Sequence, residues 1–346
     1  MLLLTVNAGS SSLRLRVVDD EDQVVASWDA LPDSLPAVDG VVHRVVHGGT
    51  AFSSPVVLTP EVEERLRALT ELAPLHQPKS LAAMDAVRAR LPGVPHVACF
   101  DTAFHATIPA AAATYALPAA WTERYGLRRF GFHGLSHSWA ARRAQDLHPQ
   151  VRRLLTCHLG AGASLCAVLD GRSVDTTMGF TPLEGLVMAT RSGSVDPGLV
   201  LWLAAREPDV EEALEKRSGL LGLAGSADLA ALLASDDETA RLAVAVYLHR
   251  LRAGIAAMAA SLGGLDALVF TGGVGENAPA VRAGAIEGLG FLGVELDPAR
   301  NAGARPDAEV SPEGAEVPVL VLHAREDLEL ARQARTVLSA GAAGPA

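Results

Sequence analysis

Short apolar runs separated by polar turns open the chain, and their spacing predicts a β-meander. Leu2–Val6 is almost continuously apolar, which is typical of a buried strand. Leu13–Val18 alternates apolar and charged positions, and a third strand is expected at Val24–Trp28 after an acidic turn. The turn Asn7–Ser12 holds small residues with three hydroxyl groups. It is either an ordinary hairpin turn or a cradle in which backbone N–H groups bind phosphate.

The same plan recurs in the second half of the chain. Residues 154–165 (LLTCHLGAGASL) repeat residues 3–13 (LLTVNAGSSSL), with Gly160 in the register of Gly9. Further strands are expected at Leu165–Leu169 and Ser173–Thr177. We interpret the repeat as evidence of two similar α/β domains that arose by duplication.

Longer periodic segments predict the helices and the other strands of these domains. Strands are expected at 41–46, 94–100, 267–270 and 317–322, and helices at 60–72, 79–91, 136–146, from Ser235 through Leu262, from about 278 and from about 326. Ser235 and Glu238 have the spacing of a capping box, and Gly263 is expected to end the helix that they begin. No apolar run is expected to be long enough to span a bilayer.

The segment Thr176–Gly198 fits neither a helix nor a strand. Its apolar residues do not alternate, and its glycine and proline residues interrupt any helical run. It is nevertheless too apolar, for example at Leu186 and Met188, for a solvated linker, and it carries one arginine, Arg191, among small residues. Such a segment is a candidate for the wall of an active site, and the alternative is a surface loop with a solvated arginine.

The composition excludes several partners and locations. A net charge of −11 argues against a surface for nucleic acid or anionic membranes. The chain has two lysines, Lys79 and Lys216, so anion recognition must use arginine, histidine, backbone amides or a metal ion. Its three cysteines have no metal-binding spacing and are expected to be buried thiols in a reducing compartment. Since the N-terminus does not resemble a signal peptide, a cytoplasmic location is expected.

Candidate catalytic groups lie at the expected ends of strands, where α/β sheets bind ligands. Arg44 is near the end of one strand and Asp101 directly follows another, although the alternative is that Asp101 only caps a turn. Thr271–Asn277 links a strand to a helix through three glycines, which is an arrangement that binds nucleotide phosphates. Together with Arg191 and Glu326 these groups predict phosphoryl transfer, which needs a metal held by carboxylates and cations around the transferring group.

The motifs of other nucleotide and metal enzymes do not fit. Neither lysine follows a glycine, so there is no Walker A loop, and the D-F-G and H-R-D sequences of protein kinases are missing. His133 and His137 have the i, i+4 spacing of metal ligands. No glutamate follows His133, however, so zinc-protease chemistry is unsupported.

Seven motifs along the chain resemble those of one family. They are Asn7–Ser12, His43–Gly49, Leu72–His76, Phe100–His105, Arg129–Gly134, Met178–Gly198 and Gly272–Asn277, in the family's order. By these motifs the chain resembles the acetokinase family, which comprises acetate kinases and their propionate and butyrate kinase relatives, within the acetate and sugar kinase/Hsp70/actin superfamily. The Met178–Gly198 segment, with its Thr-Arg-Ser-Gly sequence, is more similar to acetate kinases than to butyrate kinases.

The resemblance implies an α/β fold of two duplicated actin-like/ribonuclease-H-like domains with a central cleft. The N-terminal domain would comprise 1–148 together with the C-terminal helix at about 325–346, and the nucleotide-binding domain would comprise 149–324. The implied reaction is reversible: ATP and acetate give ADP and acetyl phosphate by direct in-line transfer. Mg²⁺ or Mn²⁺ is the implied cofactor, ATP or ADP the co-substrate, and a homodimer the implied assembly, with no nucleic acid or membrane as a partner.

The resemblance also assigns roles to single residues. The implied catalytic residues are Asp101, Arg44, Arg191 and His133, and the implied metal-binding residues are Asn7, Glu326 and Asp101. The implied acyl pocket consists of Arg44, Val46, Leu75, Phe132 and Pro182. The residues implied to contact the nucleotide and its phosphates are Ser10, Ser12, Arg14, His76, His158, Gly160, Asp228, Gly272, Gly273, Gly275, Glu276 and Asn277. On this hypothesis the segment 176–198 lines the cleft, with Pro182 against the acyl methyl group.

Three positions depart from the family's pattern. Arg14 replaces a lysine, Ala161 replaces an asparagine of the second phosphate turn, and Ala230 replaces an arginine that contacts the adenosine. The segment between Trp28 and Val41 is also shorter than usual. Two alternatives to an acetate kinase therefore stay open: an acyl kinase that prefers propionate or butyrate, and a catalytically weakened nucleotide-binding relative.

Overall fold

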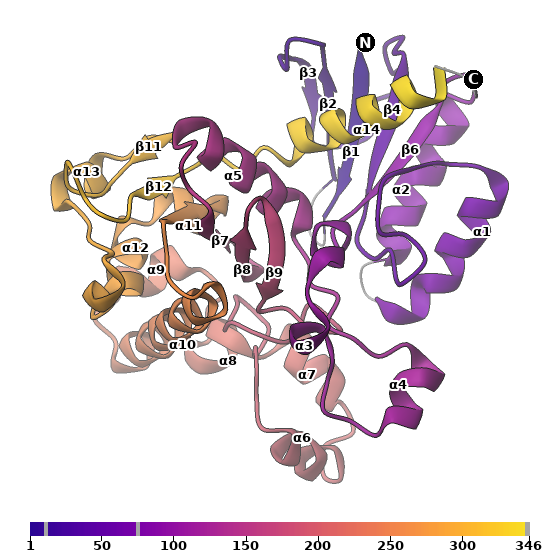
Figure 1. Ribbon diagram of the computed structural model, residues 1–346. Helices are drawn as coiled ribbons and strands as arrows, with labels where there is room; N and C mark the ends of the chain where they lie inside the picture. Colours follow the sequence, from indigo (N-terminus) through magenta and orange to yellow (C-terminus); the bar gives the residue numbers. More distant parts are fainter. Residues whose placement is uncertain (10–12, 74–76, 343–346) are drawn as a thin grey trace. The chain divides into compact units, whose positions relative to one another are not determined.

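The computed structural model describes residues 1–9, 13–73 and 77–342, which form two compact units (Figure 1). Unit 1 comprises Met1–Ala106, Phe132–Trp139 and Arg325–Ala346, and unit 2 comprises Thr107–Gly131 and Ala140–Ala324. The resemblance implies a domain boundary near residue 148, whereas in the structure residues 107–131 and 140–148 belong to unit 2. Helix α5 (Gly134–Leu147) contributes residues to both units.

Unit 1 is built on a six-stranded sheet in the order β3-β2-β1-β4-β6-β5. The strands are β1 (Leu3–Ala8), β2 (Leu13–Val18), β3 (Val24–Trp28), β4 (Gly40–Val45), β5 (Val56–Val57) and β6 (His96–Phe100). The first three form an antiparallel meander, as the alternation predicts, and β1, β4 and β6 are parallel. The carboxyl ends of three neighbouring strands therefore meet at one edge of this sheet.

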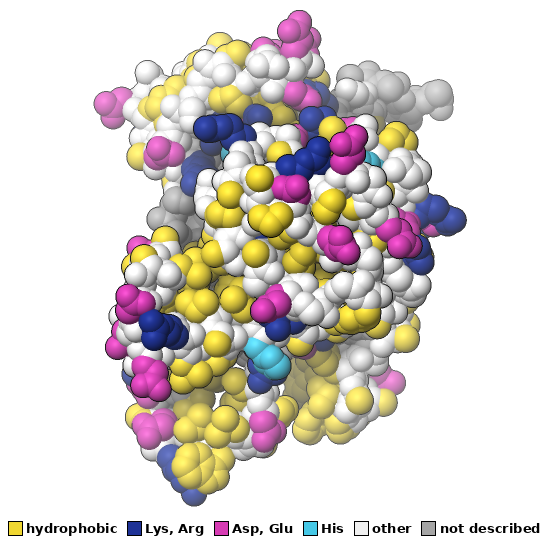
Figure 2. Space-filling view, turned by 90° about the vertical axis from the view of Figure 1, so that its left-hand side faces the viewer, with side chains coloured by type: hydrophobic (Ala, Val, Ile, Leu, Met, Phe, Trp, Pro, Cys, Tyr) yellow, Lys and Arg dark blue, Asp and Glu magenta, His cyan; other side chains and the backbone are white. Residues whose placement is uncertain are grey.

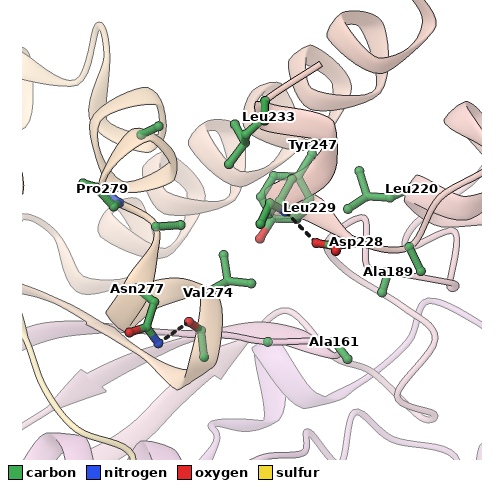
Figure 3. Close-up of a pocket in the computed structure, with 17 residues that line it drawn as sticks. Ala161, Ala189, Leu220, Asp228, Leu229, Leu233, Tyr247, Val274, Asn277 and Pro279 are labelled. Carbon is green, nitrogen blue, oxygen red and sulfur yellow. Dashed lines mark hydrogen bonds between the residues drawn. The ribbon is translucent and has the colours of Figure 1, made fainter. Parts of the chain in front are cut away.

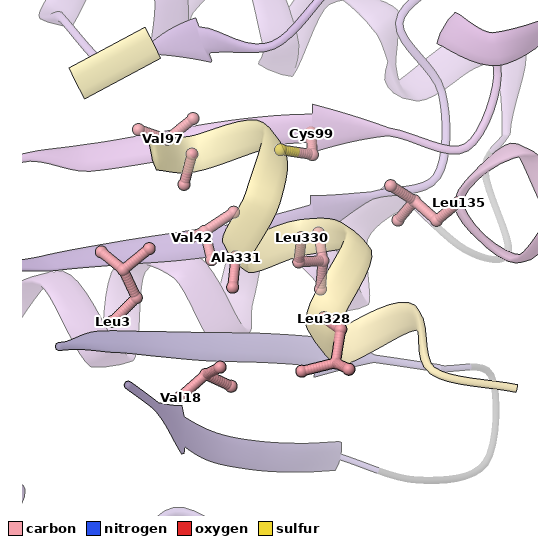
Figure 4. Packing of buried hydrophobic residues seen from close by; sticks show 10 residues of the cluster. Leu3, Val18, Val42, Val97, Cys99, Leu135, Leu328, Leu330 and Ala331 are labelled. Atoms are coloured by element: carbon pink, nitrogen blue, oxygen red, sulfur yellow. The ribbon is translucent and has the colours of Figure 1, made fainter. Parts of the chain in front are cut away.

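Helices cover both faces of this sheet, which explains why its central strands are apolar at successive positions. On one face lies α14 (Glu326–Ala342), which packs on Leu3, Val42 and Val97 (Figure 4). On the other face α2 (Gln77–Arg90) packs near Leu4 and Val41, next to α1 (Pro60–Ala68) and the 3₁₀ helix η1 (Leu69–Leu72). A second 3₁₀ helix, η2 (Ala103–Thr107), follows β6.

Unit 2 repeats the strand order of unit 1. Its sheet has the order β11-β12-β10-β7-β8-β9. The strands are β7 (Arg153–Leu159), β8 (Ala163–Leu169), β9 (Arg172–Thr176), β10 (Ala267–Thr271), β11 (Ala308–Glu309) and β12 (Val319–Val321). The meander β7-β8-β9 is antiparallel, and β7, β10 and β12 are parallel. The prediction of two similar α/β domains is therefore confirmed by the topology of the two sheets.

The helices of unit 2 surround this sheet and the segment that follows β9. They are α3 (Ala110–Ala113), α4 (Ala119–Tyr125), α6 (Pro197–Ala204), α7 (Val210–Lys216), α8 (Gly219–Ala224), α9 (Leu229–Leu233), α10 (Glu238–Leu262), α11 (Gly272–Asn277), α12 (Pro279–Ile286), η3 (Gly290–Leu292) and α13 (Pro298–Gly303).

Helix α10 corrects two sequence predictions. Its N-cap is Asp237, whose carboxylate accepts hydrogen bonds from the N–H groups of Thr239 and Ala240, so Ser235 does not cap it. By length and composition α10 is also apolar enough to cross a membrane, contrary to expectation. Its buried residues recur every three or four positions, for example Leu251 and Ile255, and α10 packs on the unit 2 sheet. This stripe is typical of a core helix.

Two buried histidines link β4 to β6 in unit 1. The imidazoles of His43 and His96 stack with ring centroids 5.2 Å apart, and His43 Nε2 lies 2.8 Å from His96 Nδ1. Since His96 Nε2–H donates to the carbonyl of Leu91 at 2.9 Å, His96 Nδ1 is the acceptor for His43 Nε2–H. Burial, assisted by His96 and Arg88, lowers the pKa of His43 to about 3. Both rings are thus held neutral.

Unit 1 should therefore lose stability in mild acid. The unfolded chain protonates His43 near its ordinary pKa of about 6.5, whereas the folded chain resists protonation until about pH 3. The free energy of unfolding should fall as the pH drops below about 6.5, with His43 contributing up to about 1.4 kcal/mol per pH unit. Urea unfolding of wild type and His43→Gln at about pH 7, 6 and 5 measures this pH dependence of the free energy of unfolding.

The expected result is a weaker pH dependence in His43→Gln than in wild type. His249→Gln, which alters an exposed histidine of α10, should keep the wild-type dependence. Equal slopes for wild type and His43→Gln would contradict the prediction.

Candidate functional site

Polar side chains form a hydrogen-bonded chain at the carboxyl ends of the parallel strands of unit 1. Arg44 on β4 binds Asp101, which directly follows β6, through Nε (3.0 and 3.1 Å) and Nη2 (2.6 Å). Arg44 Nη1 donates to Asn7 Oδ1 on β1 at 3.1 Å, and Asn7 Nδ2 donates to Glu326 Oε2 at 2.6 Å. Four residues predicted as functional, which are distant in the sequence, are thus brought together.

The Arg44–Asp101 ion pair is largely shielded from water. The side chain of Asp101 is 2% exposed and that of Arg44 is 13% exposed. Burial by itself lowers the pKa of Arg44, but the carboxylates of Asp101 and Glu326 outweigh it and raise the pKa overall. Arg44 therefore remains a cation, and loss of either partner would leave a buried charge uncompensated, at a cost of about 3–5 kcal/mol.

The oxygen atoms of these hydrogen-bonded side chains suit a magnesium ion better than a zinc ion. In the part of the chain that the structure describes, no three His, Cys, Asp or Glu side chains converge as a metal site. Asp101 and Glu326 offer carboxylates and Asn7 an amide oxygen. Mg²⁺ commonly takes one or two carboxylates and completes its shell with water and phosphate, so this donor set fits it.

The backbone at His133 is anchored to the same edge of the unit 1 sheet. His133 has φ = +57°, in the left-handed region that non-glycine residues rarely adopt. The N–H of Gly134 donates to the carbonyl oxygen of Asp101 at 2.9 Å. A Cβ atom at Gly134 would lie 2.1 Å from that oxygen, so only glycine permits this approach. The position of His133 is therefore tied to that of Asp101.

His105 supports the residue before His133. Its Nε2 lies 3.0 Å from the carbonyl oxygen of Phe132, and burial lowers the pKa of His105 to about 4. The neutral ring therefore donates Nε2–H to that carbonyl. His137 packs edge-on against His105, with centroids 5.7 Å apart. His105 and His137 thus support the His133 backbone within unit 1.

The predicted acyl-pocket residues are only partly described. Val46 and Phe132 are buried in unit 1, 6% and 1% exposed, and Phe132 lies edge-on to His47. Pro182 is buried in unit 2. The predicted residues Leu75, His76, Ser10 and Ser12 lie outside the described residues.

The segment Thr176–Gly198 is irregular, as predicted, and it is anchored in unit 2. Its backbone pairs with the start of α8, because Ser218 N–H donates to Thr190 O (2.9 Å) and Leu220 N–H donates to Met188 O (3.0 Å). Met188 is fully buried. These contacts rule out a solvated surface loop.

Arg191 is held inside this segment by a partner that the sequence did not indicate. Its Nη1 donates to the carbonyl oxygen of Pro182 at 2.8 Å, and its Nε lies 3.9 Å from Glu215 Oε2 on α7. The two side chains are 13% and 12% exposed. Burial lowers the pKa of Arg191 and raises that of Glu215, and each charge partly offsets the shift of the other. Glu215 belongs to an acidic helix, α7, that resembles an ordinary surface helix in sequence.

A pocket of about 570 Å³ lies in unit 2 among α8, α9, α10 and α11 (Figure 3). Its lining is mostly apolar, and no lysine or arginine belongs to it among the described residues. The lining includes four residues predicted to contact a nucleotide, Gly160, Asp228, Gly273 and Asn277. The two departures from the family pattern in unit 2, Ala161 and Ala230, line the same pocket.

The other residues predicted to contact the nucleotide, as far as the structure describes them, do not line this pocket. Gly272 and Gly275 are buried in α11, His158 lies on β7, and Arg14 lies exposed on β2 of unit 1. Glu276 instead anchors the segment before α14: its carboxylate accepts from Ala324 N–H (2.9 Å) and lies 2.6 Å from His323 Nδ1.

A buried arginine holds the glycine-rich helix α11 from its C-terminal end. Arg282 on α12 is 1% exposed and donates to the carbonyl oxygens of Gly275 (2.8 Å) and Glu276 (2.9 Å). Its Nε donates to Asn301 Oδ1 at 2.7 Å. These bonds satisfy carbonyls that a helix end leaves unpaired. No sequence pattern indicates this role of Arg282, because its partner Asn301 lies on a separate helix.

The sequence and fold are similar to those of known acyl kinases. A sequence model of the Acetokinase family matches residues 23–332. Acetate kinase from Gloeobacter violaceus is 52% identical over 309 residues, which cover 86% of this chain and 76% of that protein. Acetate kinase from Leifsonia xyli subsp. xyli is 50% identical over 315 residues, which cover 88% of this chain and 79% of that protein.

Solved structures give the same result. The crystal structure of Porphyromonas gingivalis acetate kinase superposes with a TM-score of 0.89 and 33% identity, covering 97% of this chain and 99% of that one. A propionate kinase from Francisella tularensis subsp. tularensis superposes with a TM-score of 0.89 and 31% identity, with coverage of 97% and 99%. The predicted two-domain actin-like fold class is confirmed by these similarities.

Substituting Gly134 should disrupt the packing of its backbone against Asp101 at the edge of the unit 1 sheet. In Gly134→Ala the new methyl group meets backbone at 2.1 Å, so the free energy of unfolding should fall by about 2 kcal/mol or more. Gly93→Ala in the same unit is the matched control, because a Cβ at Gly93 has no heavy atom within 4 Å. Urea unfolding measures both. Equal stability of the two variants would contradict the close approach of Gly134 to Asp101.

Proposed function

This chain belongs to the acetokinase family, and on that basis we propose that it catalyses the reversible phosphorylation of acetate by ATP. The products are ADP and acetyl phosphate. The observation that carries this proposal is the chain Glu326–Asn7–Arg44–Asp101 at the edge of the unit 1 sheet. It combines a fixed cation with oxygen donors for Mg²⁺, and phosphoryl transfer requires both.

Arg44 is suited to bind the carboxylate substrate or the transferring phosphoryl group. Its bonds to Asp101 and Asn7 use Nε–H and one N–H of each terminal nitrogen. A guanidinium has five N–H donors, so two remain for an anion as far as the described residues show. Because the ion pair fixes the plane of the guanidinium, little entropy is lost when an anion binds.

The oxygen donors of unit 1 would hold the metal. Asp101, Glu326 and Asn7 would bind or orient Mg²⁺, directly or through water. When bound, Mg²⁺ supplies positive charge that neutralises the β- and γ-phosphate oxygens. Asp101 would then have two roles, one toward the metal and one in positioning Arg44.

His133 and Arg191 are proposed to stabilise the charge that develops on the transferring group. The left-handed backbone of His133 and its link to Asp101 fix its position in unit 1. Arg191 is a mostly buried cation in unit 2, and an electrostatic group is more effective where water is excluded. One acetate oxygen would attack the γ-phosphorus in line as the bond to the ADP oxygen breaks.

The unit 2 pocket is proposed to hold the nucleoside part of ATP. Its volume of about 570 Å³ is within the range of small-molecule sites, and a flat base suits its apolar lining. Asp228, Asn277 and Gly273 belong to its lining, and Figure 3 labels the first two. Arg282 would keep the glycine-rich helix α11 in shape beneath the nucleotide.

Homodimer formation is also proposed, because α6 exposes large apolar side chains. Leu201 is 73% exposed and Trp202 is 53% exposed, next to Leu199 and Val195. In Figure 2 hydrophobic side chains gather at the lower end of the view, where Figure 1 places α6. Sedimentation should give twice the chain mass of 36.0 kDa for wild type and the single mass for Leu201→Glu. A wild-type monomer would contradict this proposal.

A cytoplasmic location is proposed from the cysteines. Cys99, Cys157 and Cys166 are buried thiols that form no disulfide bond with one another, a state that a reducing compartment preserves.

The proposed reaction is tested by trapping acyl phosphate with hydroxylamine. Wild type with Mg-ATP should form hydroxamate from acetate, with a higher kcat/KM than from propionate or butyrate. Each added methylene changes binding by about 1–3 kcal/mol, so the ratios identify the preferred acid. A preference for propionate or butyrate would support the nearest alternative, since the propionate kinase has the same fold. No hydroxamate from any of the three acids would exclude an acyl kinase.

Arg191 and Glu215 should contribute to turnover to different degrees. Arg191→Ala should lower kcat by about 10³-fold or more, because the cation is lost. Glu215→Gln should lower kcat by about tenfold, a loss of about 1.4 kcal/mol, because the guanidinium stays but is less firmly held. Lys216→Gln, on the same helix but in an exposed pair with Glu212, is the control and should be near wild type. A Glu215→Gln variant that unfolds more easily but turns over normally would show that Glu215 has only a structural role.

A further inference from the structure

The pocket of unit 2 offers few polar side chains to a ligand. Asp228 uses Oδ1 to accept hydrogen bonds from the N–H groups of Ala230 and Ala231. Asn277 donates Nδ2–H to the carbonyl oxygen of Gly273 at 2.9 Å. The remaining side chains of the lining are apolar or absent, except for the hydroxyl group of Tyr247. Recognition of a base must therefore rely on very few groups.

Tyr247 carries a buried hydroxyl that has no protein partner. Tyr247 belongs to the core stripe of α10 and is 3% exposed, yet it lines the pocket. Within the described residues its Oη makes no hydrogen bond. Figure 3 shows the ring beside Leu229, with the oxygen turned toward the side of the pocket that Val274 lines. The hydroxyl therefore points toward the pocket from its wall, where the surrounding side chains cover the oxygen almost completely.

Such a hydroxyl is costly unless something binds it. A buried polar group without a partner costs about 1–3 kcal/mol, so native proteins rarely keep one without a function or a bound molecule. Burial, with a smaller effect from Cys157, also raises the pKa of Tyr247. The group is thus an O–H donor throughout the physiological range.

The neighbouring positions make this donor more important. Ala161 and Ala230 bring only methyl groups to the lining, and Leu220, Leu229 and Leu233 add further apolar surface. A flat heterocycle with ring-nitrogen acceptors matches an apolar slot whose wall holds a buried, unpartnered hydroxyl donor. A site built to bond a particular atom rejects analogues that lack it more strongly than apolar contact does.

We propose that Tyr247 Oη–H donates a hydrogen bond to a ring nitrogen of the purine base in this pocket, and that Tyr247 is the side chain that sets base preference. This inference rests on the proposed function, because it takes the occupant of the pocket to be ADP or ATP. It assigns to α10, a core helix, a role that the family motifs of the chain do not include.

The test is Tyr247→Phe, which removes the hydroxyl and keeps the ring. Calorimetry with ADP should show binding about threefold to tenfold weaker than in wild type. Thermal unfolding without nucleotide should occur at the same or a higher temperature, because an unpartnered hydroxyl has been removed. The analogues 1-deaza-, 3-deaza- and 7-deaza-ADP each lack one ring nitrogen. The analogue that lacks the nitrogen bonded by Tyr247 should bind wild type as weakly as ADP binds Tyr247→Phe. Its affinity should be the same for wild type and Tyr247→Phe, because the hydrogen bond is already missing.

The other two tyrosines are matched controls. Tyr125 is 57% exposed, so Tyr125→Phe should change neither property. Tyr115 Oη donates to Glu184 at 2.6 Å, so Tyr115→Phe should unfold at a lower temperature while binding ADP normally.

Three results would overturn the inference. The first is ADP binding by Tyr247→Phe within twofold of wild type. The second is a loss of affinity from wild type to Tyr247→Phe that is equal for all three analogues. The third is a wild type that does not bind ADP. A wild type that binds ADP but forms no acyl phosphate would overturn the proposed function and leave the inference intact.

Discussion

Helices cover both faces of the unit 1 sheet, so the buried ion pair of this sheet lies where the strands end, and the polar pair inside the sheet, His43 and His96, is neutral. Leu3 and Leu4 are neighbours in sequence, and each is buried under a different helical layer. Polar side chains begin where β1, β4 and β6 leave these layers, and there Arg44 and Asp101 form a buried ion pair. The packing of the sheet and helices excludes water from this ion pair. The cation of Arg44 can be buried there because the carboxylate of Asp101 compensates its charge.

Much of this arrangement was predictable from the sequence, since it follows local patterns. Apolar alternation predicts the meander strands β2 and β3 at their observed bounds, and the repeated hairpin predicts the duplicated sheets. The irregular segment 176–198 was identified because its pattern fits no regular element. The cap of α10 was assigned wrongly to Ser235, because two acceptable capping residues lie two positions apart and only the backbone path selects Asp237.

The remaining features depend on contacts between distant parts of the chain. Glu215 approaches Arg191 only because α7 folds against an irregular segment. Arg282 bonds directly to α11 and is held in place by Asn301 on α13. Tyr247 is one apolar position among many in the pattern of α10, and only the pocket distinguishes it. No single-sequence signal marks such residues. The lining of the unit 2 pocket therefore follows less directly from the sequence than the position of Asn7, Arg44 and Asp101 at the ends of strands.

Helix α14 has a consequence for the order in which the chain acquires its structure during synthesis. Unit 2 is made entirely from residues before 325, so all of its elements are available before α14 emerges from the ribosome. The first unit must wait, because α14 covers one face of its sheet through Leu330 and Ala331. The same helix begins with Glu326, which completes the polar chain at Asn7. Nascent chains should therefore keep one face of the first sheet uncovered until α14 has been made, and chaperone protection of that face matters most before then.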